Sequence, residues 1–138
     1  RRLPSRDDAS KEGPLPARNR LRLEALPLLS EIMNRDITPA IVRAVQSSQE
    51  DQEAIDELLE VLDLVDPQER LFLPKLRNLP EALQRRALFL YLQDSGIPDL
   101  SRDLITRCLA LFDSEGPAKV NLPGDHHLRR RARRIFVE

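Results

Sequence analysis

The sequence has little cysteine, glycine or aromatic content, and each scarcity narrows what the chain can do. The one cysteine cannot form a disulfide within the chain, so we expect the reducing cytoplasm as its compartment. The four glycines form neither the Walker pattern nor the dinucleotide-binding pattern that cradles phosphates. No apolar run reaches the ~18 residues that span a bilayer, and no charged-then-apolar leader begins the chain. We therefore expect neither a membrane anchor nor export.

Catalytic and metal-binding patterns are also absent. His126 and His127 are adjacent, but no second Cys/His pair lies at metal-ligand spacing, so no metal site is predicted. No serine or cysteine has a base at a recognisable motif spacing. Cys108 lies among apolar residues, which indicates a buried structural thiol.

The opening stretch Ala17–Met33 has apolar residues at helical spacing and arginines on a second face. Arg18 and Arg22 are four residues apart, so they share one face of a helix about a turn apart. Pro27 removes a backbone donor inside this pattern and should kink or split the helix. One face could pack while the other binds an anion, although an ordinary amphipathic helix with solvated arginines has the same pattern. The apolar stripe comprises Leu21, Ala25, Leu28 and Leu29.

A second helix is predicted to run from Pro39, with Thr38 as its N-cap, to about Val65. Its two ends are apolar, but its middle, residues 46–53, has no apolar side chain. A helix with a polar middle usually connects two packed regions instead of lying in one core. We therefore interpret it as a connector whose acidic residues point away from any nucleic acid.

The remaining sequence predicts short helices followed by a small sheet. After a joint at residues 66–79 with a short extended piece, Pro80 and Ser101 begin helices, the first of which ends at Gly96. Strand-like runs surround the turn Pro123-Gly124-Asp125, namely residues 119–122, 127–131 and 133–137. The predicted fold class is mainly α with a small C-terminal antiparallel β-sheet (α+β). It comprises a kinked opening helix, a long connector helix and a helical domain closed by a β-hairpin or three short strands.

Five arginines occupy six positions between Arg129 and Arg134. Strand alternation places Arg129 and Arg131 on one side, and Leu128 and Arg130 on the other. Arginine favours bidentate contact with phosphate, so this sheet is a candidate cationic surface. An unstructured basic tail is the alternative, but three β-forming residues at 135–137 argue against it.

Charge is strongly segregated although the net charge is only −1. Residues 1–22 carry seven bases and three acids, residues 70–86 five and one, and residues 119–138 six and two, so each segment has a net charge of +4. Residues 44–69 carry nine acids and no base. This pattern indicates either a polyanionic partner touched at several places or blocks that neutralise one another within the fold.

The few aromatic residues fall mainly at predicted core positions. If the polyanion is RNA, contact with its folded backbone therefore fits better than base stacking. The residues concerned are Phe72, Phe89, Tyr91, Phe112 and Phe136.

Several of these segments together resemble bacterial tRNA(Ile)-lysidine synthetase. That family has an acidic-x-Ser-Asn turn, an Arg-Asn-x-x-Arg motif and a Leu-Pro-Leu-Leu helix, which resemble Asp8-Ala9-Ser10, residues 18–22 and residues 26–29. Residues 79–86 are similar to the start of its helical C-terminal domain. Residues 120–124 followed by Leu128-x-Arg130 are similar to that domain's closing hairpin. The similarity covers about residues 6–138, with a departure at Lys11, where the family usually has Asn.

The resemblance implies an enzyme that uses ATP, with Mg²⁺, to activate C2 of the wobble cytidine C34 in isoleucine tRNA, and then attaches lysine to give lysidine. The family's ATP site is a Ser-Gly-Gly-x-Asp-Ser loop in an N-terminal α/β domain, and this sequence has no such loop. We therefore expect residues 1–38 to be the tail end of the catalytic domain, residues 39–66 an acidic connector and residues 67–138 a tRNA-recognition domain. This chain alone is expected to be inactive and to bind neither ATP nor lysine.

The same resemblance assigns candidate site residues and partners. Asp8 and Ser10 are expected at the edge of the active site, with no catalytic residue in this chain. The expected partners are tRNA(Ile) and the missing N-terminal catalytic domain, and a homodimer is also considered. Two alternatives stay open: a stand-alone RNA-binding module, and a helical protein–protein adaptor whose acidic helix is the active surface. The predicted tRNA-binding residues are Arg18, Asn19, Arg22, Arg85, Arg86, Arg129, Arg130, Arg131, Arg133 and Arg134.

Overall fold

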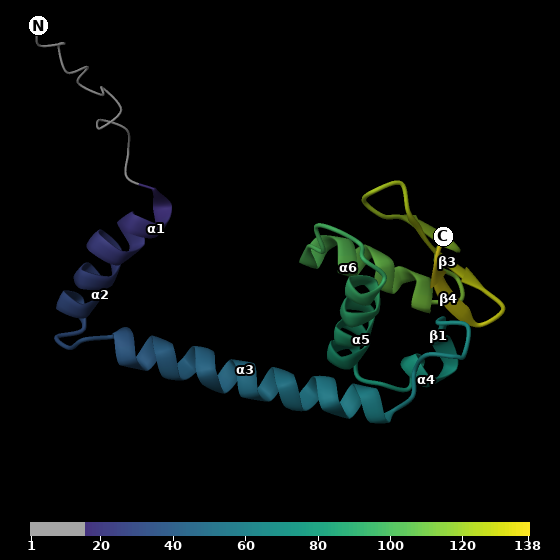
Figure 1. Cartoon of the computed structure of the whole chain (residues 1–138), viewed down its shortest axis with the longest axis horizontal. Coiled ribbons are helices and arrows are strands. Elements are labelled where there is room, and N and C mark those ends of the chain that lie inside the picture. Colours follow the sequence, from purple (N-terminus) through teal and green to yellow (C-terminus); the bar gives the residue numbers. More distant parts are fainter. Residues whose placement is uncertain (1–15) are drawn as a thin grey trace, which may run out of the picture. The chain divides into compact units, whose positions relative to one another are not determined.

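The computed structural model describes residues 16–138 (Figure 1). The chain divides into two compact units, residues 1–49 and residues 50–138. The helix α3 crosses this boundary, since it spans Thr38–Val61. The assignment of residues 1–38, 39–66 and 67–138 to a catalytic-domain end, a connector and a tRNA-recognition domain stays a prediction. Within the described residues, no helix is long and apolar enough to cross a membrane.

The first unit begins with a helical stretch in three parts: α1 (Ala17–Arg20), the π-helical η2 (Leu21–Ala25) and α2 (Leu26–Ile32). At the end of η2 the backbone N–H of Leu26 donates to the carbonyl of Leu21, five residues back. Pro27 follows and has no N–H, so the regular bond to the carbonyl of Leu23 cannot form. The predicted interruption at Pro27 is therefore confirmed in the form of a widened helical turn.

The start of α3 depends on two side chains that precede it. Asp36 Oδ1 accepts a 2.9 Å hydrogen bond from the backbone N–H of Thr38, and Ser30 Oγ accepts a 3.3 Å bond from that of Ile37. The hydrogen bonds from Thr38 also hold the pKa of Asp36 below its ordinary value. Our prediction that Thr38 caps this helix is wrong, because Thr38 already lies in the helix and Asp36 supplies the capping oxygen.

The helices of the second unit begin and end at predicted local signals. Ser101 Oγ caps α6 by accepting a 3.1 Å bond from the N–H of Leu104. Gly96 follows α5 at a φ of +74°, and there the N–H of Ile97 donates to the carbonyl of Leu92 at 3.0 Å. After α3, the helical elements are α4 (Leu73–Arg77), α5 (Glu81–Asp94), α6 (Arg102–Leu109) and the 3₁₀ turn η3 (Ala110–Phe112).

The joint expected at residues 66–79 is more structured than the sequence indicated. The short extended piece is confirmed as strand β1 (Leu71–Phe72), but α4 follows it directly. Pro74 lies in the first turn of α4, where its missing N–H removes no helical bond. The proline therefore begins a helix at a place where we expected a loop.

A four-stranded antiparallel sheet completes the second unit, in the order β1-β4-β3-β2. Ala132 and Arg133 join β3 to β4 at positive φ values of 49° and 60°, which is the tight hairpin geometry whose twist suits antiparallel strands. The C-terminal strands are β2 (Lys119–Asn121), β3 (His127–Arg131) and β4 (Arg134–Val137). The α+β class and the three C-terminal strands are confirmed, and β1 adds a fourth strand from much earlier in the chain.

The core of this unit lies between the inner face of the sheet and the helices. Leu71, Leu128 and Ile135 come from three different strands, and each is at most 1% exposed. Leu88 of α5 and Cys108 of α6 are fully buried in the same cluster. This burial confirms the prediction of a buried thiol at Cys108, and it raises the pKa of that thiol to about 11.

Candidate nucleic-acid interface

The strand register divides the side chains of the sheet between two faces. Directly paired residues point to the same side, and Arg134 pairs with both Phe72 and Arg131, while Phe136 pairs with Arg129. The side opposite the core, called here the outer sheet face, therefore carries Phe72, Lys119, Asn121, His127, Arg129, Arg131, Arg134, Phe136 and Glu138. It is rich in cations.

The predicted alternation along β3 is confirmed. Arg129 and Arg131 lie on the outer sheet face. Leu128 is buried on the opposite face, and Arg130 lies on the same face as Leu128. The Arg130 guanidinium donates to the carbonyls of Leu111 (3.1 Å), Ser114 (3.1 Å) and Gly116 (3.0 Å). These bonds hold the connection between α6 and β2 against the sheet. Phosphate contact by Arg130 stays a prediction, and it competes with these carbonyls.

Asp66 fixes Arg134. Its Oδ2 accepts from Arg134 Nε at 2.8 Å and from Arg70 Nη2 at 2.8 Å, and its Oδ1 accepts the backbone N–H groups of Gln68 and Arg70 at 3.0 Å each. The Arg70 side chain, with these other donors, holds the pKa of Asp66 far below its ordinary range. The Arg134 guanidinium lies 4.3 Å from the centroid of the Phe72 ring. Arg134 is therefore held from two sides.

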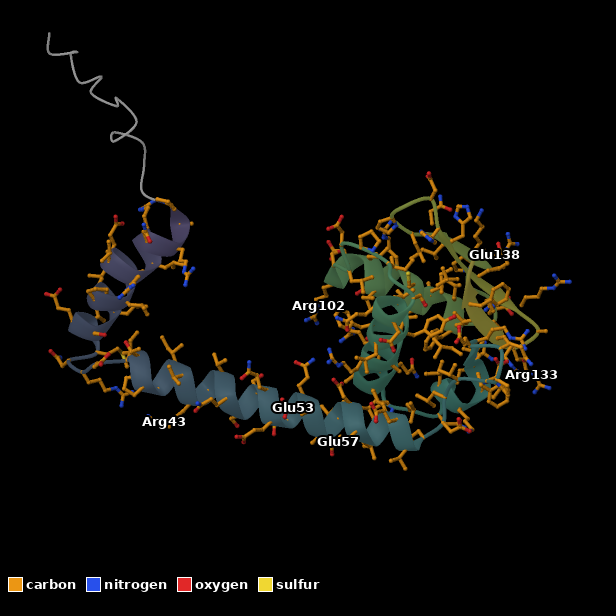
Figure 2. The ribbon with its side chains drawn as sticks, in the orientation of Figure 1. Arg43, Glu53, Glu57, Arg102, Arg133 and Glu138 are labelled. Atoms are coloured by element: carbon orange, nitrogen blue, oxygen red, sulfur yellow. The ribbon has the colours of Figure 1, made fainter. Side chains whose placement is uncertain are left out.

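The other cations at this end of the sheet are more available. Arg129 pairs with Glu138 at 2.8 Å, but both side chains are about 40% exposed, so solvent weakens this pair. Arg131 and Arg133 are exposed and form no ion pair within residues 16–138. Arg133 lies at the turn of the β3–β4 hairpin (Figure 2). The hairpin therefore presents guanidinium groups to solvent.

Arg85 and Arg86 lie on α5 instead of the sheet, and both have acidic partners. Arg86 donates Nε and Nη2 to the two carboxylate oxygens of Asp56 at 2.6 Å each, which ties α5 to α3. This contact lowers the pKa of Asp56. Arg85 pairs with Glu81 one turn earlier. Each of these two positive charges is therefore balanced by a neighbouring carboxylate. Their roles in tRNA binding stay predictions.

The first unit presents exposed arginines and exposed apolar residues. Arg18, Asn19 and Arg22 are all exposed, and Arg20 pairs with Glu24 at 3.1 Å. Asp8 and Ser10 lie outside the described residues. Six apolar side chains of residues 21–33 are 45–64% exposed. They are Leu21, Leu23, Leu28, Leu29, Ile32 and Met33.

Two aromatic residues of the outer sheet face differ from the sequence prediction. Phe112 is buried, and Phe89 and Tyr91 pack against the core, as expected. Phe72 and Phe136 are only half-buried and lie on the face opposite the core, so their placement in the core was wrong. The alternation of Phe136 with Ile135 and Val137 would have indicated this, whereas the pairing of β1 had no local signal.

Metal-binding groups do not gather in the described residues. Between residues 16 and 138, no three His, Cys, Asp or Glu side chains lie close enough to hold an ion. His126 Nδ1 instead lies 3.3 Å from the carbonyl of Pro123 in its own turn.

Comparison with known proteins assigns part of the second unit to a class. Residues 71–136 match the family model described as the TilS substrate binding domain. This range runs from the first strand of the sheet to the last, and so it contains the outer sheet face. The fold and the cationic face thus belong to a substrate-binding domain.

Relatives extend the match over most of the chain. A tRNA(Ile)-lysidine synthase of Streptomyces coelicolor is 30% identical over 142 residues, covering 98% of this chain and 40% of the relative. Enzymes of the same name from Rhodococcus erythropolis and Thermosynechococcus vestitus are 38% and 33% identical, covering 86% and 81% of this chain and 37% and 34% of their own lengths. The resemblance to the tRNA(Ile)-lysidine synthase family is therefore confirmed, and residues 71–136 belong to its substrate binding domain. The chain spans at most about two fifths of these relatives.

Proposed function

We propose that this chain supplies tRNA binding and positioning to a tRNA(Ile)-lysidine synthase, the cytoplasmic ATP-dependent ligase that attaches lysine to C34 of isoleucine tRNA. The observation that carries the proposal is the exposed cationic group on and beside the outer sheet face, inside the segment that matches a substrate binding domain. Phosphates dominate nucleic-acid affinity, and arginine binds them in bidentate fashion. The group consists of Lys119, Arg129, Arg131 and Arg133.

The chemistry belongs, in this proposal, to a catalytic part outside this chain. ATP, lysine and Mg²⁺ bind there, and the chain alone has no ligase activity. Arg18, Asn19 and Arg22, with Asp8 and Ser10, lie at the edge of that active site. The exposed apolar side chains around Leu21 and Leu28 support this arrangement, because leaving so much apolar surface in water is unfavourable without a covering partner.

The first experiment measures binding of a tRNA(Ile) transcript to the 138-residue chain by fluorescence anisotropy over a salt series. Replacing two phosphate contacts should weaken binding and flatten its salt dependence by about one counterion per arginine. Arg131→Ala/Arg133→Ala is therefore expected to bind more weakly, with a slope smaller by about two. The matched control is Arg102→Ala/Arg107→Ala, which removes the same charge from exposed arginines of α6. Figure 2 shows Arg102 at the end of α6 away from the sheet.

Two results would overturn the proposal. One is a wild-type chain that does not bind tRNA at moderate salt. The other is an equal loss of slope in both double variants, because binding would then follow net charge and not this surface.

The adaptor alternative rests on the exposed acids of α3. Glu50, Asp51, Glu53 and Glu57 are exposed, and none pairs with a base within residues 16–138. The same tRNA titration decides between the alternatives, since an adaptor would not bind the transcript.

A further inference from the structure

We propose that the outer sheet face stacks unpaired bases of the bound RNA, with Phe72 and Phe136 as the stacking surfaces and Lys119, Arg129 and Arg131 as the phosphate contacts beside them. This inference rests on the proposed RNA-binding function and deepens it. It names single-stranded nucleotides, not the backbone of a double helix, as the part of the RNA that this face recognises.

Phe72 and Phe136 lie on the same side of two adjacent strands, as diagonal neighbours. Phe72 pairs directly with Arg134, and Phe136 is two residues further along β4 on the same side. Such diagonal neighbours on adjacent strands have their Cα atoms about 7–8 Å apart, which is within reach of aromatic side chains. The three side chains therefore form one continuous row across β1 and β4.

Neither ring contributes to the core. Phe72 and Phe136 are half-buried, and they lie outside both the buried cluster and the partly buried residues that pack on it. The core is already filled from the other face by Leu71, Leu128 and Ile135. Phe136 thus offers an aromatic ring that the core does not use, and the Phe72 ring, also outside the core, carries the Arg134 guanidinium 4.3 Å from its centroid.

The row is also fixed before any ligand arrives. Asp66 holds Arg134 Nε at 2.8 Å while the guanidinium lies on the Phe72 ring at 4.3 Å. The backbone N–H of Leu73 donates to the carbonyl of Arg133 at 3.2 Å, which anchors the hairpin turn to the start of α4. A planar guanidinium can itself stack on a base, so Arg134 extends the row. A surface held in this way loses little entropy on binding.

Charge decides between RNA and a protein as the occupant. Each ring has a cation directly opposite on the paired strand: Arg134 opposite Phe72, and Arg129 opposite Phe136. Lys119 and Arg131 extend the positive charge. The acids at this face are Glu138, which pairs with Arg129, and Asp66, which pairs with Arg134. Aromatic rings between cations bind single-stranded nucleic acids, where bases stack and phosphates pair.

The test uses the full 138-residue chain and two RNA probes, an unstructured single strand of eight nucleotides and a blunt duplex of the same sequence. Phe72→Leu/Phe136→Leu keeps apolar volume but removes both aromatic faces. Because a stacked base contributes on the order of 1–3 kcal/mol, we expect the double variant to bind the single strand at least about tenfold more weakly. Its salt slope should stay unchanged, since no charge is lost, and its binding of the duplex should change little.

A second variant gives a direct signal. The chain contains no tryptophan, so Phe136→Trp introduces one fluorophore that preserves the aromatic face. The single strand is expected to quench its emission and the duplex is not. Circular dichroism melts of both variants check that they fold.

The outcomes separate this inference from the proposed function. Unchanged single-strand affinity in folded Phe72→Leu/Phe136→Leu, or equal quenching of Phe136→Trp by both probes, overturns base stacking. The proposed function stands in that case if Arg131→Ala/Arg133→Ala still weakens tRNA binding, and it fails if the wild-type chain binds no RNA. Quenching by the catalytic part of the enzyme but not by the single strand would identify the face as a protein contact and also overturn the inference.

Discussion

The two units of the chain have apolar residues at similar helical spacing, but they bury them very differently. Every fully buried side chain of the described structure lies between Leu59 and Ile135, in the second unit. In the first unit, by contrast, Leu21, Leu28 and Ile32 are 61%, 56% and 64% exposed. The second unit therefore has the core of an independent domain. In the described part of the first unit, residues 16–49, the amphipathic pattern leaves its apolar side chains largely exposed.

The largest effect is expected when one buried side chain is removed from the second unit, which tests whether its core stabilises it as the comparison implies. Leu88 is fully buried in the cluster between α5 and the sheet. Leu88→Ala should lower the free energy of unfolding by roughly 2–5 kcal/mol, because it loses buried apolar area and leaves a cavity. Urea denaturation followed by circular dichroism measures this loss. A change below about 1 kcal/mol would mean that the core is not as closely packed as its burial indicates.

A smaller effect is expected from the carboxylates that organise each unit. Asp66 joins Arg70 and Arg134 across 68 positions of sequence, whereas Asp36 holds only the start of α3. Asp66→Asn should therefore lower the thermal midpoint of the second unit, and Asp36→Asn should lower it less. Thermal melts at pH 7 compare the two variants.

The pH dependence of the same melts tests the charge of Asp66. Its pKa is lower in the folded chain than in the unfolded chain, so its contribution is fully present above about pH 5 and is lost as the pH falls through and below the ordinary value of about 3.9. The difference between the wild type and Asp66→Asn should accordingly shrink on acidification from pH 5 to pH 2. A difference that grows on acidification contradicts the ion pair as its cause.

The smallest effect is expected in the first unit. Leu28→Ser removes an apolar side chain that is already mostly in water, so the free energy of unfolding of the 138-residue chain should change by no more than about 0.5 kcal/mol. The same substitution should weaken association with a separately produced catalytic part, which pull-down titration measures. Strong destabilisation of the isolated chain would show that Leu28 already has a partner within it.

Local signals predicted most of the elements because each depends on a few neighbouring residues. The cap at Ser101, the left-handed residue Gly96 and the turn at residues 123–125 were all readable in the sequence and confirmed. The cap of α3 was misplaced by two residues, since Asp36 and Thr38 are both good capping residues and only the backbone path chooses between them.

The candidate surface was only half predictable. Alternation along β3 correctly separated Arg129 and Arg131 from Arg130. It could not indicate that Arg130 would be engaged by three carbonyls or that Arg86 would pair with Asp56, since those partners lie 14–30 residues away. The sequence composition alone favoured backbone contact over base stacking. The pairing of β1 with β4 places Phe72 on the outer sheet face, and the proposal of base stacking rests on that placement.

The sequence by itself determined the starts of α5 and α6, the C-terminal hairpin, the segregation of charge and the resemblance to the family, because these follow from local propensity and from short motifs. The tertiary structure decided which arginines are engaged and which face solvent, and it placed Phe72 beside Arg134 although 62 residues separate them in sequence. The physical reason is that a strand of two residues has almost no local preference. Its partner, and with it the composition of the outer sheet face, is set only when the core closes behind Leu71.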